Sequence, residues 1–589
     1  MSMPDVPEDI WRSIANLVPK HILRNMYEVN GTFYDLAMNE RYREVNCDRL
    51  DSTMRRLLEE SSSTITQPIR PVASRVRVFR MRLYFIQKLI HLQTHHLLHP
   101  NDVFTSPTFV SLFSLLQSFP RLNEYHIDWH NLPTISDPLL QLLVRPFIYP
   151  NQLRKVSLDI GMEKFHAFAS FLSQHAPLIA LEELSLILRH EGQVFNGPTH
   201  ANAFHSLLTS NTIPSFITQS QNPNTLRSLT LEFTHAEDFS SVFWSLAQCE
   251  SVGQPALRQL QSLTLSIPTP SPRLGDPAAL AAFISAHSAT LTDLTLRGQW
   301  EHNFELGLSG LPSPSFSAYI ERCFSQISLP NLTSLSIATT SYPIPTAIAV
   351  VANFVGSLTE LDLTGSYMSF VDVEELVGVF RVSLLLGQRA GQSSSPPLKV
   401  LQIGPLSLSP QLVDLLAEEL PGLRELNIRV RDAVPHKDDQ PVYHGLGRFV
   451  AGRKLRKQMP EQIHAFFHEM KTRLYADWQL EEIGVWKFDT RLQFQRQYAK
   501  LFARCVPSIR FPESVRKEAM ISSEELPMLS SPSACAVEAS VLSASVSQHT
   551  LALAPLTDDV PTVCGWCALS DAGLSTTTNG SGCRCNVIR

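Results

Sequence analysis

Between residues 150 and 430, short stretches in which apolar and polar residues alternate recur along the chain. Each follows one pattern: an apolar residue, two variable ones, an apolar residue, one variable one and an apolar residue. Alternation with a period of two is typical of a strand that buries one face. We therefore expect a short strand in each copy. Eight close copies begin at Leu181, Leu226, Leu260, Leu291, Leu332, Leu358, Leu398 and Leu423.

Weaker copies of the strand pattern extend the series in both directions. They begin at Val78, Leu122, Leu153 and Leu480, which brings the number of copies to twelve. The mean spacing is about 36.5 residues, longer than the ~20 to 29 residues of regular leucine-rich repeats. The spacing varies from 25 residues, between Leu398 and Leu423, to 57 residues, between Leu423 and Leu480. We therefore expect an irregular array over residues 78–512, with an insertion at about 431–479.

Helices are predicted between the strands. Apolar residues at helical spacing follow a capping residue and a proline, a pair that starts helices because proline is pre-organised for the first helical position. A strand and its helix cannot bury their apolar sides alone, but stacked units share a core, with strands on the concave face and helices on the convex face. The alternative is a doubly wound αβ domain, whose buried strands are also apolar. The four capping pairs are Ser106-Pro107, Asp137-Pro138, Asp276-Pro277 and Ser409-Pro410.

Composition and charge exclude several classes of protein. Hydrophobic residues make up 44% of the 589 residues, and the formal net charge is −6, which suits a large core and gives no reason to expect nucleic acid as a partner. The first residues lack the basic and apolar pattern of a secretory signal, and no apolar stretch reaches the ~20 residues of a membrane helix. We expect a cytoplasmic or nuclear protein with no membrane contact. Residues 513–589 are rich in Ser and Thr, and we expect a disordered tail there.

Residues 1–45 have a different pattern, which predicts short amphipathic helices packed closely together. Pro19 cannot continue the first helix, and apolar residues at helical spacing resume after Lys20. Chains below about 40 residues rarely build a stable core without help, so this segment implies a helical motif that depends on a partner. We expect residues 46–77 to form a helical linker to the array.

Two resemblances follow from these patterns. The copies between Val78 and Val485 resemble the leucine-rich-repeat family, although most lack the asparagine that usually follows the strand. Residues 1–45 resemble the F-box, and the combination resembles fungal-type F-box/leucine-rich-repeat proteins. The positions that carry the F-box resemblance are Val6, Pro7, Ile10, Ile14, Leu17, Val18, Pro19, Leu23, Val29 and Phe33.

The resemblance implies a substrate-recognition subunit of an SCF-type ubiquitin ligase. In that role the ten F-box positions bind a Skp-family adaptor, the adaptor binds a cullin scaffold, and the repeats bind a target protein. One alternative is that the N-terminal helices cap the open end of the solenoid. The chain is then a leucine-rich-repeat scaffold without any ubiquitin machinery.

The variable positions of the strand pattern are the candidate target-binding residues. They face the concave surface in a repeat array and form a hydroxyl-rich surface of mixed charge. No cluster of titratable groups converges there, which favours a protein-binding face over a catalytic pocket. The charged candidates are Asp159, Glu232, Asp293, Arg297, Glu360, Asp362, Glu425 and Arg429.

The sequence gives weaker support to other candidate sites. His91, His95 and His99 recur at helical spacing, but no ligand partner except Asp102 accompanies them, and we favour a solvated face. Four thiols in the tail have a permissive zinc spacing, Cys564, Cys567, Cys583 and Cys585, but nothing nearby supplies a supporting core. The basic run within 448–457 is interpreted as solvated. No phosphate-binding, nucleophile-elbow or metalloprotease motif occurs, so we expect no catalytic residue, no metal and no cofactor.

Overall fold

In the computed structural model, the chain divides into two compact units, Met1–Ile521 and Ser522–Arg589. Only the first contains residues that the structure describes. These are 6–49, 51–62, 72–86, 107–117, 119–129, 137–148, 153–175, 181–189, 212–219, 225–234, 238–248, 257–267, 275–297, 314–389, 398–439, 455–487 and 492–510. The predicted disordered tail, the three histidines from His91 to His99 and the four tail cysteines lie outside them.

Strands and helices alternate along the described part of the chain. The helices are α1 (Glu8–Leu17), α2 (Lys20–Leu23), α3 (Gly31–Arg41), α4 (Ser52–Ser62), α6 (Pro107–Gln117), α7 (Asp137–Ile148), α8 (Met162–His175), α10 (Thr212–Gln219), α11 (Ser240–Ala247), α12 (Pro277–Ala286), α13 (Pro314–Phe324), α14 (Ile344–Ala352), α15 (Phe370–Arg389), α16 (Pro410–Glu419), α17 (Leu455–Met470) and α18 (Leu492–Cys505). A short 3-10 turn spans Val72–Arg75. The strands are β1 (Glu44–Cys47), β2 (Val78–Arg82), β3 (Glu124–Trp129), β4 (Lys155–Gly161), β5 (Glu183–Arg189), β6 (Ser228–Phe233), β7 (Ser262–Ser266), β8 (Asp293–Arg297), β9 (Ser334–Ile337), β10 (Glu360–Met368), β11 (Val400–Pro405), β12 (Ser407–Leu408), β13 (Glu425–Val430), β14 (Asp432–Ala433) and β15 (Glu482–Lys487).

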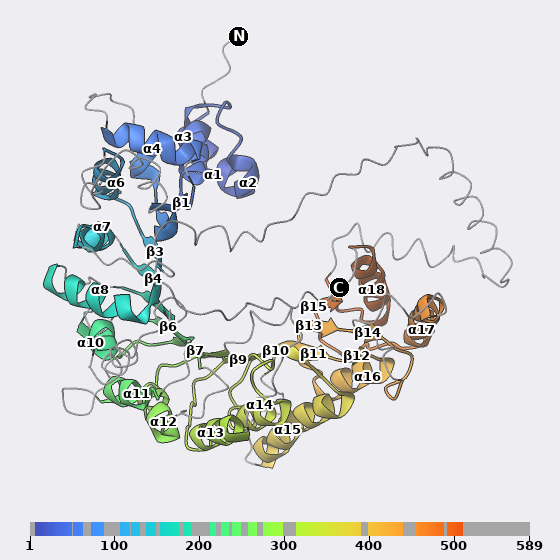
Figure 1. Cartoon of the computed structure of the whole chain (residues 1–589). Helices are drawn as coiled ribbons and strands as arrows, with labels where there is room; N and C mark the ends of the chain where they lie inside the picture. The colour runs from blue at the N-terminus through green and yellow to red at the C-terminus, as the bar shows by residue number, and fades with distance from the viewer. Residues whose placement is uncertain are drawn as a thin grey trace, which may run out of the picture. The chain divides into compact units, whose positions relative to one another are not determined.

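The described strands form one parallel sheet of 13 strands, in the order of the chain from β1 to β15, and a second sheet of β12 and β14. Chain order without crossovers distinguishes this sheet from a doubly wound sheet, in which the strand order reverses. From β2 to β13 the strands line the inner side of the array and the helices lie on its outer side (Figure 1). The predicted α/β solenoid is therefore confirmed. We call the sheet face turned away from these helices the open face.

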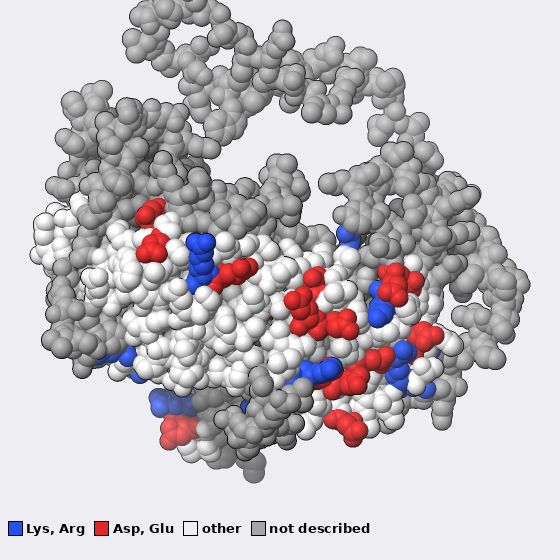
Figure 2. Space-filling model, turned by 90° about the horizontal axis from the view of Figure 1, so that it is seen from below, with Lys and Arg blue, Asp and Glu red and all other residues white. Residues whose placement is uncertain are grey.

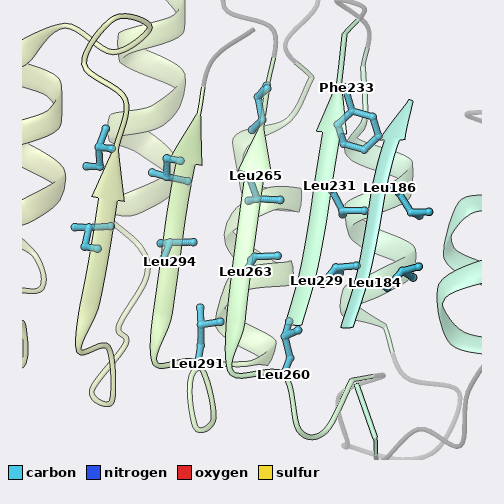
Figure 3. Close-up of a cluster of buried hydrophobic side chains, with 14 of the residues drawn as sticks. Leu184, Leu186, Leu229, Leu231, Phe233, Leu260, Leu263, Leu265, Leu291 and Leu294 are labelled. Carbon is cyan, nitrogen blue, oxygen red and sulfur yellow. The ribbon is translucent and has the colours of Figure 1, made fainter. Parts of the chain in front are cut away.

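The core lies between the sheet and the helices. Along β4, β6 and β8 the apolar residues are buried, while the polar residues between them are partly exposed. Equivalent leucines pair in register from strand to strand, as in Leu184↔Leu229↔Leu263↔Leu294. Figure 3 shows these leucines on the helix side of neighbouring strands. Each added unit thus extends one continuous apolar layer, which explains why the strand pattern repeats along the sequence.

A ladder of backbone hydrogen bonds joins the residues that precede the strands. The amide of Thr333 donates to the carbonyl of Thr292, and that of Thr359 to the carbonyl of Thr333, at 2.8 Å each. The hydroxyls of Thr333 and Thr359 donate to the same two carbonyls at 3.2 and 3.1 Å. These threonines add side-chain bonds to the turns in repeats that lack the usual asparagine.

The predicted helix starts agree with the structure. Helices α6 and α16 begin at Pro107 and Pro410, α12 begins at Pro277, and α7 begins at Asp137. The Asp276 carboxylate accepts from the amide of Ala278 at 2.9 Å, and the Ser409 hydroxyl accepts from the amide of Leu412 at 3.2 Å. Both side chains satisfy amides that a helix start otherwise leaves unpaired.

The array starts earlier than the sequence analysis placed it. Strand β1 follows α3 after two residues. The buried residues Tyr42, just before β1, and Val45 and Cys47, within it, match the strand pattern. The copy assigned to Val78 begins instead at Val76, because β2 aligns Phe79 with Tyr125 of β3. Residues 46–77, predicted as a helical linker, contain the end of β1, α4 and the turn Val72–Arg75, and they belong to the array.

The last copy of the pattern forms β15, which pairs with β13 in parallel. The predicted insertion at about 431–479 contains β14 and α17. The indole of Trp478 then donates to the carbonyl of Leu420 at 3.1 Å and ties the end of this segment to the preceding repeat. The amide of Arg510 donates to the carbonyl of Glu481 at 2.8 Å, so the backbone ladder continues one step beyond β15.

Candidate functional site

The N-terminal helices α1, α2 and α3 form a small module around a core of their own. Ala15, Leu23 and Phe33 are buried together, separately from the main core of the array. The Trp11 ring packs edge-on against Phe33, with ring centroids 5.9 Å apart. The side-chain oxygen of Asn30 accepts from the amide of Phe33 at 2.9 Å and caps α3. The module therefore has a small core of its own, distinct from the core of the array.

A stripe of apolar side chains on the module remains exposed. Val6, Ile10, Ile14 and Leu17 recur at helical spacing, and their exposed fractions are 38%, 49%, 41% and 86%. Ile22 and Val29 continue the exposed set at 46% and 51%. Exposed apolar residues gathered in one place indicate an interaction surface, whereas single ones need no explanation. We call Val6, Ile10, Ile14 and Leu17 the α1 stripe.

The ten predicted adaptor-binding residues divide into two groups. Leu23 and Phe33 lie in the module's core, and Val18 packs against it, so these three act through the fold of the module. Truncating them disturbs the module itself, whereas truncating the remaining seven tests a surface. Those seven are exposed: Val6, Pro7, Ile10, Ile14, Leu17, Pro19 and Val29.

The open face of the sheet has three zones. In the first, over β1 to β5, charges on neighbouring strands neutralise one another. Arg80 pairs with Glu44 at 2.8 Å, and Lys155 pairs with Glu183 at 2.7 Å. The predicted target-binding residue Asp159 accepts two hydrogen bonds from the Arg189 guanidinium, one of them at 2.8 Å. This zone offers a partner few charges that are not already paired.

The hydrogen bonds that Arg189 donates to Asp159 are the largest of several causes that raise the pKa of Arg189. His126, on β3, lies in the same zone between Arg80 and Ser157 in the strand register. Burial, with Arg80 close by, lowers the pKa of His126. The neutral imidazole is therefore favoured in this zone.

The second zone of the open face is rich in hydroxyls. At the middle position of six neighbouring strands, the residues pair in register and all are Ser or Thr. Short uncharged side chains keep this zone flat and lose little rotamer freedom when a partner covers them. The six residues are Ser157, Ser185, Thr230, Thr264, Thr295 and Ser336.

In the third zone, over β8 to β15, described acids accept hydrogen bonds from neutral donors. Asp293 accepts from the hydroxyl of Thr292 at 2.6 Å, Asp362 from that of Ser336 at 3.2 Å, and Glu425 from the amide of Asn427 at 2.8 Å. The other predicted target-binding residues on this side, Arg297, Glu360 and Arg429, are exposed. Glu232, on β6, is partly exposed.

Metal ligands and reactive thiols are the remaining candidates for chemistry among the described residues. No group of three potential ligands among them could hold a metal ion. The thiols of Cys47 and Cys323 are buried, and burial raises the pKa of each to about 12, so neither is a thiolate nucleophile near neutral pH. Within the described part of the chain, no helix has the length and apolar character to span a bilayer.

The described surface on the face that Figure 2 shows is not strongly charged. In the face of Figure 2, uncharged residues dominate, and basic and acidic residues occur side by side in small groups. The visible described surface on this side thus has no large patch of a single sign.

Comparisons with known proteins give structural similarities only. No protein-family model matches the sequence, and no curated protein matches it. A crystal structure of the Rad7 and Elc1 complex in yeast is similar at 13% identity and a TM-score of 0.35, covering 75% of this chain and 92% of that one. The leucine-rich repeat-containing protein LegL7 from Legionella pneumophila is similar at 13% identity and a TM-score of 0.28, covering 54% of this chain and 78% of that one.

The sheet, its helix layer and the repeated strand phrase together define the class. The chain is a leucine-rich-repeat-type solenoid, in which one parallel sheet in chain order packs against a layer of helices. Sequence analysis missed the repeat that begins at Tyr42, because tyrosine and cysteine replace leucine in it. A search that accepted any buried-type residue at the three apolar positions would have found it.

Proposed function

We propose that this chain is the substrate-recognition subunit of an SCF-type ubiquitin ligase. The observation that carries the proposal is the α1 stripe, four apolar side chains exposed on a helical module that already has its own core. In this proposal the stripe docks on a Skp-family adaptor, and the adaptor connects the chain to a cullin scaffold. The module then acts as the F-box that its sequence resembles.

The open face of the solenoid supplies the second half of the proposed function. The second and third zones of this face bind a target protein, and the paired charges of the first zone stabilise the sheet itself. We propose that the chain has no active site and acts inside the cell without nucleic acid or a membrane. It contributes proximity, since holding a target near a ubiquitin-loaded enzyme makes the transfer effectively intramolecular.

The test is co-expression with a Skp-family adaptor, followed by recovery of the adaptor on the intact chain and on an Ile10→Ala, Leu17→Ala double variant. Both side chains are exposed, so we expect the double variant to fold with an unchanged melting temperature. Truncation of a central interface residue costs about 2 kcal/mol or more of binding, and we expect recovery of the adaptor to be lost.

Val371→Ala is the matched control. Val371 is an apolar side chain on α15 with an exposed fraction of 67%, far along the chain from the module. The control should recover as much adaptor as the intact chain. If the intact, folded chain recovers no adaptor, the ubiquitin-ligase role is wrong.

The second candidate function is a leucine-rich-repeat scaffold in which the N-terminal helices only cap the solenoid. It is favoured by the contact of Met38 and Tyr42, at the end of α3, with the main core of the array. The α1 stripe distinguishes the two candidate functions, because a role as a cap does not explain why these apolar side chains are exposed.

A further inference from the structure

Helix α3 belongs to two cores at once. Phe33 and Leu36 take part in the core of the N-terminal module, whereas Met38 and Tyr42 pack against the main core of the array. Only two residues separate the end of α3 from β1, the first strand of the sheet. The module is therefore joined to the solenoid by a shared helix, without a flexible linker.

One buried arginine fastens this shared helix to the array. Arg75 ends the turn Val72–Arg75, directly before the residue that opens the second repeat, and only 8% of it is exposed. Its guanidinium donates to the backbone oxygen of Asp35 at 2.9 Å, to the carboxylate of Asp35 at 2.8 Å and to the side-chain oxygen of Asn39 at 2.8 Å. All three acceptors lie on α3.

The geometry of these bonds constrains direction as well as distance. A guanidinium is a planar fork, so bonds from two of its nitrogens fix the orientation of the group to which they point. Asp35 and Asn39 are one helical turn apart, and bonds to both hold the axis of α3 against rotation and tilt. A second contact supports the same end of the helix, since the Arg56 guanidinium lies 5.8 Å from the ring centroid of Tyr42.

We propose that Arg75 is a positioning residue that fixes the direction of the N-terminal module relative to the open face of the sheet. Its functional meaning rests on the proposed function: an adaptor docked on the α1 stripe would then hold the target-binding face at one fixed orientation to the rest of the ligase. The geometric claim itself does not depend on the identity of the partner. Modules that lack such a network of hydrogen bonds between them are expected to move relative to one another.

The experiment is single-molecule energy transfer between fluorophores on non-natural amino acids at positions 24 and 322, which leaves the nine native cysteines unchanged. Both positions are exposed, one beside α2 and one in α13. The full chain should give one narrow distance distribution. Arg75→Ala should broaden it by about twofold or more, as expected when a domain interface is released. Arg75→Lys keeps the charge but loses the fork, and should broaden it less.

Controls separate positioning from general stability. Arg154→Ala breaks an exposed ion pair with Glu182, 3.4 Å apart, and should leave the distribution unchanged. If Arg75→Ala does not fold, an Asp35→Ala, Asn39→Ala variant removes both side-chain acceptors and leaves the buried arginine in place. Recovery of a Skp-family adaptor should be the same for all folded variants.

If the distance distribution keeps its width both in Arg75→Ala and in the double variant at Asp35 and Asn39, the positioning role of Arg75 is wrong. If these variants no longer recover the adaptor and the width of the distance distribution is unchanged, Arg75 stabilises the fold of the module and does not set its direction. Failure of the intact chain to recover the adaptor would count against the proposed function, and the distance measurement would still decide the role of Arg75.

Discussion

His287, the residue directly after α12, is a buried histidine whose charge is set by its surroundings. Only 1% of it is exposed, and its ring packs edge-on against Phe283 with centroids 5.3 Å apart. Burial is the main cause that lowers the pKa of His287 from 6.5 to about 4. The folded chain therefore keeps this imidazole neutral under conditions in which the unfolded chain protonates it.

This difference predicts a pH dependence of stability. Because the unfolded chain takes up the proton first, the free energy of unfolding falls as the pH drops below the unfolded pKa and levels off below the folded one. Between pH 7 and pH 5 the loss attributable to His287 is about 2 kcal/mol. Denaturant unfolding of the intact chain and of His287→Phe at both pH values measures it.

In His287→Phe the part of the pH dependence due to this residue should disappear. His166→Gln, at an exposed histidine on α8, is the control and should keep the dependence of the intact chain. Equal pH dependence in the intact chain and in His287→Phe would contradict the assignment.

At the residue scale, sequence analysis identified the buried residues of the strand pattern but not the partners of the charged ones. The leucines of the strand pattern are buried because they fill the space between the sheet and the helices. Target binding by Asp159 stays a prediction, and the structure adds that Asp159 accepts hydrogen bonds from Arg189, which comes from the next repeat. A pairing between residues 30 positions apart depends on the sheet register, which local pattern does not reveal.

At the scale of elements, the long strand β10 contains a glycine that no other residue can replace without strain. Gly365 has a φ of +135°, and a Cβ atom there would lie 2.7 Å from the backbone nitrogen of Thr340. The register between β10 and β11 shifts beyond Leu363, close to this point. Gly365 thus allows β10 to bend past the neighbouring turn.

Replacing this glycine should destabilise the protein. We expect Gly365→Ala to cost about 2 kcal/mol or more, since the unfavourable backbone conformation and the clash with Thr340 add together. Gly378→Ala is the matched control: it lies within α15 and a Cβ there meets nothing within 4 Å. That change should stabilise the helix by about 0.5–1 kcal/mol.

Unfolding in denaturant compares the two alanine variants directly. A Gly365→Ala midpoint equal to that of the intact chain would show that the backbone at this position is not constrained as described.

The helices could be predicted with their starting residues, because capping and proline act locally. Asp276 and Ser409 cap α12 and α16 as their positions indicated. The start of the array could not be predicted in the same way. Tyr42 and Cys47 are buried in the core, but their identities do not match a leucine pattern, and the pairing of β1 with β2 identifies the repeat.

At the scale of the whole molecule, two surfaces lie on one continuous structure. The exposed α1 stripe belongs to the N-terminal module, and the open face belongs to the sheet that begins directly after α3. The exposed stripe could be predicted as a set of residues, but its separation into surface and core positions could not. Leu23 and Ile14 have the same apolar character in the sequence, and only packing distinguishes them.

That distinction supplies the most direct test of the account. A purified Skp-family adaptor is titrated into the intact chain, into Ile14→Ala and into Leu23→Ala, and the melting temperature of each is measured. Ile14 is 41% exposed and Leu23 is 7% exposed, so the two truncations should act differently. Ile14→Ala should weaken adaptor binding by about 2 kcal/mol at an unchanged melting temperature, whereas Leu23→Ala should destabilise the module. Absence of adaptor binding by the intact chain, or an Ile14→Ala variant that melts earlier and binds as well as the intact chain, would contradict the account.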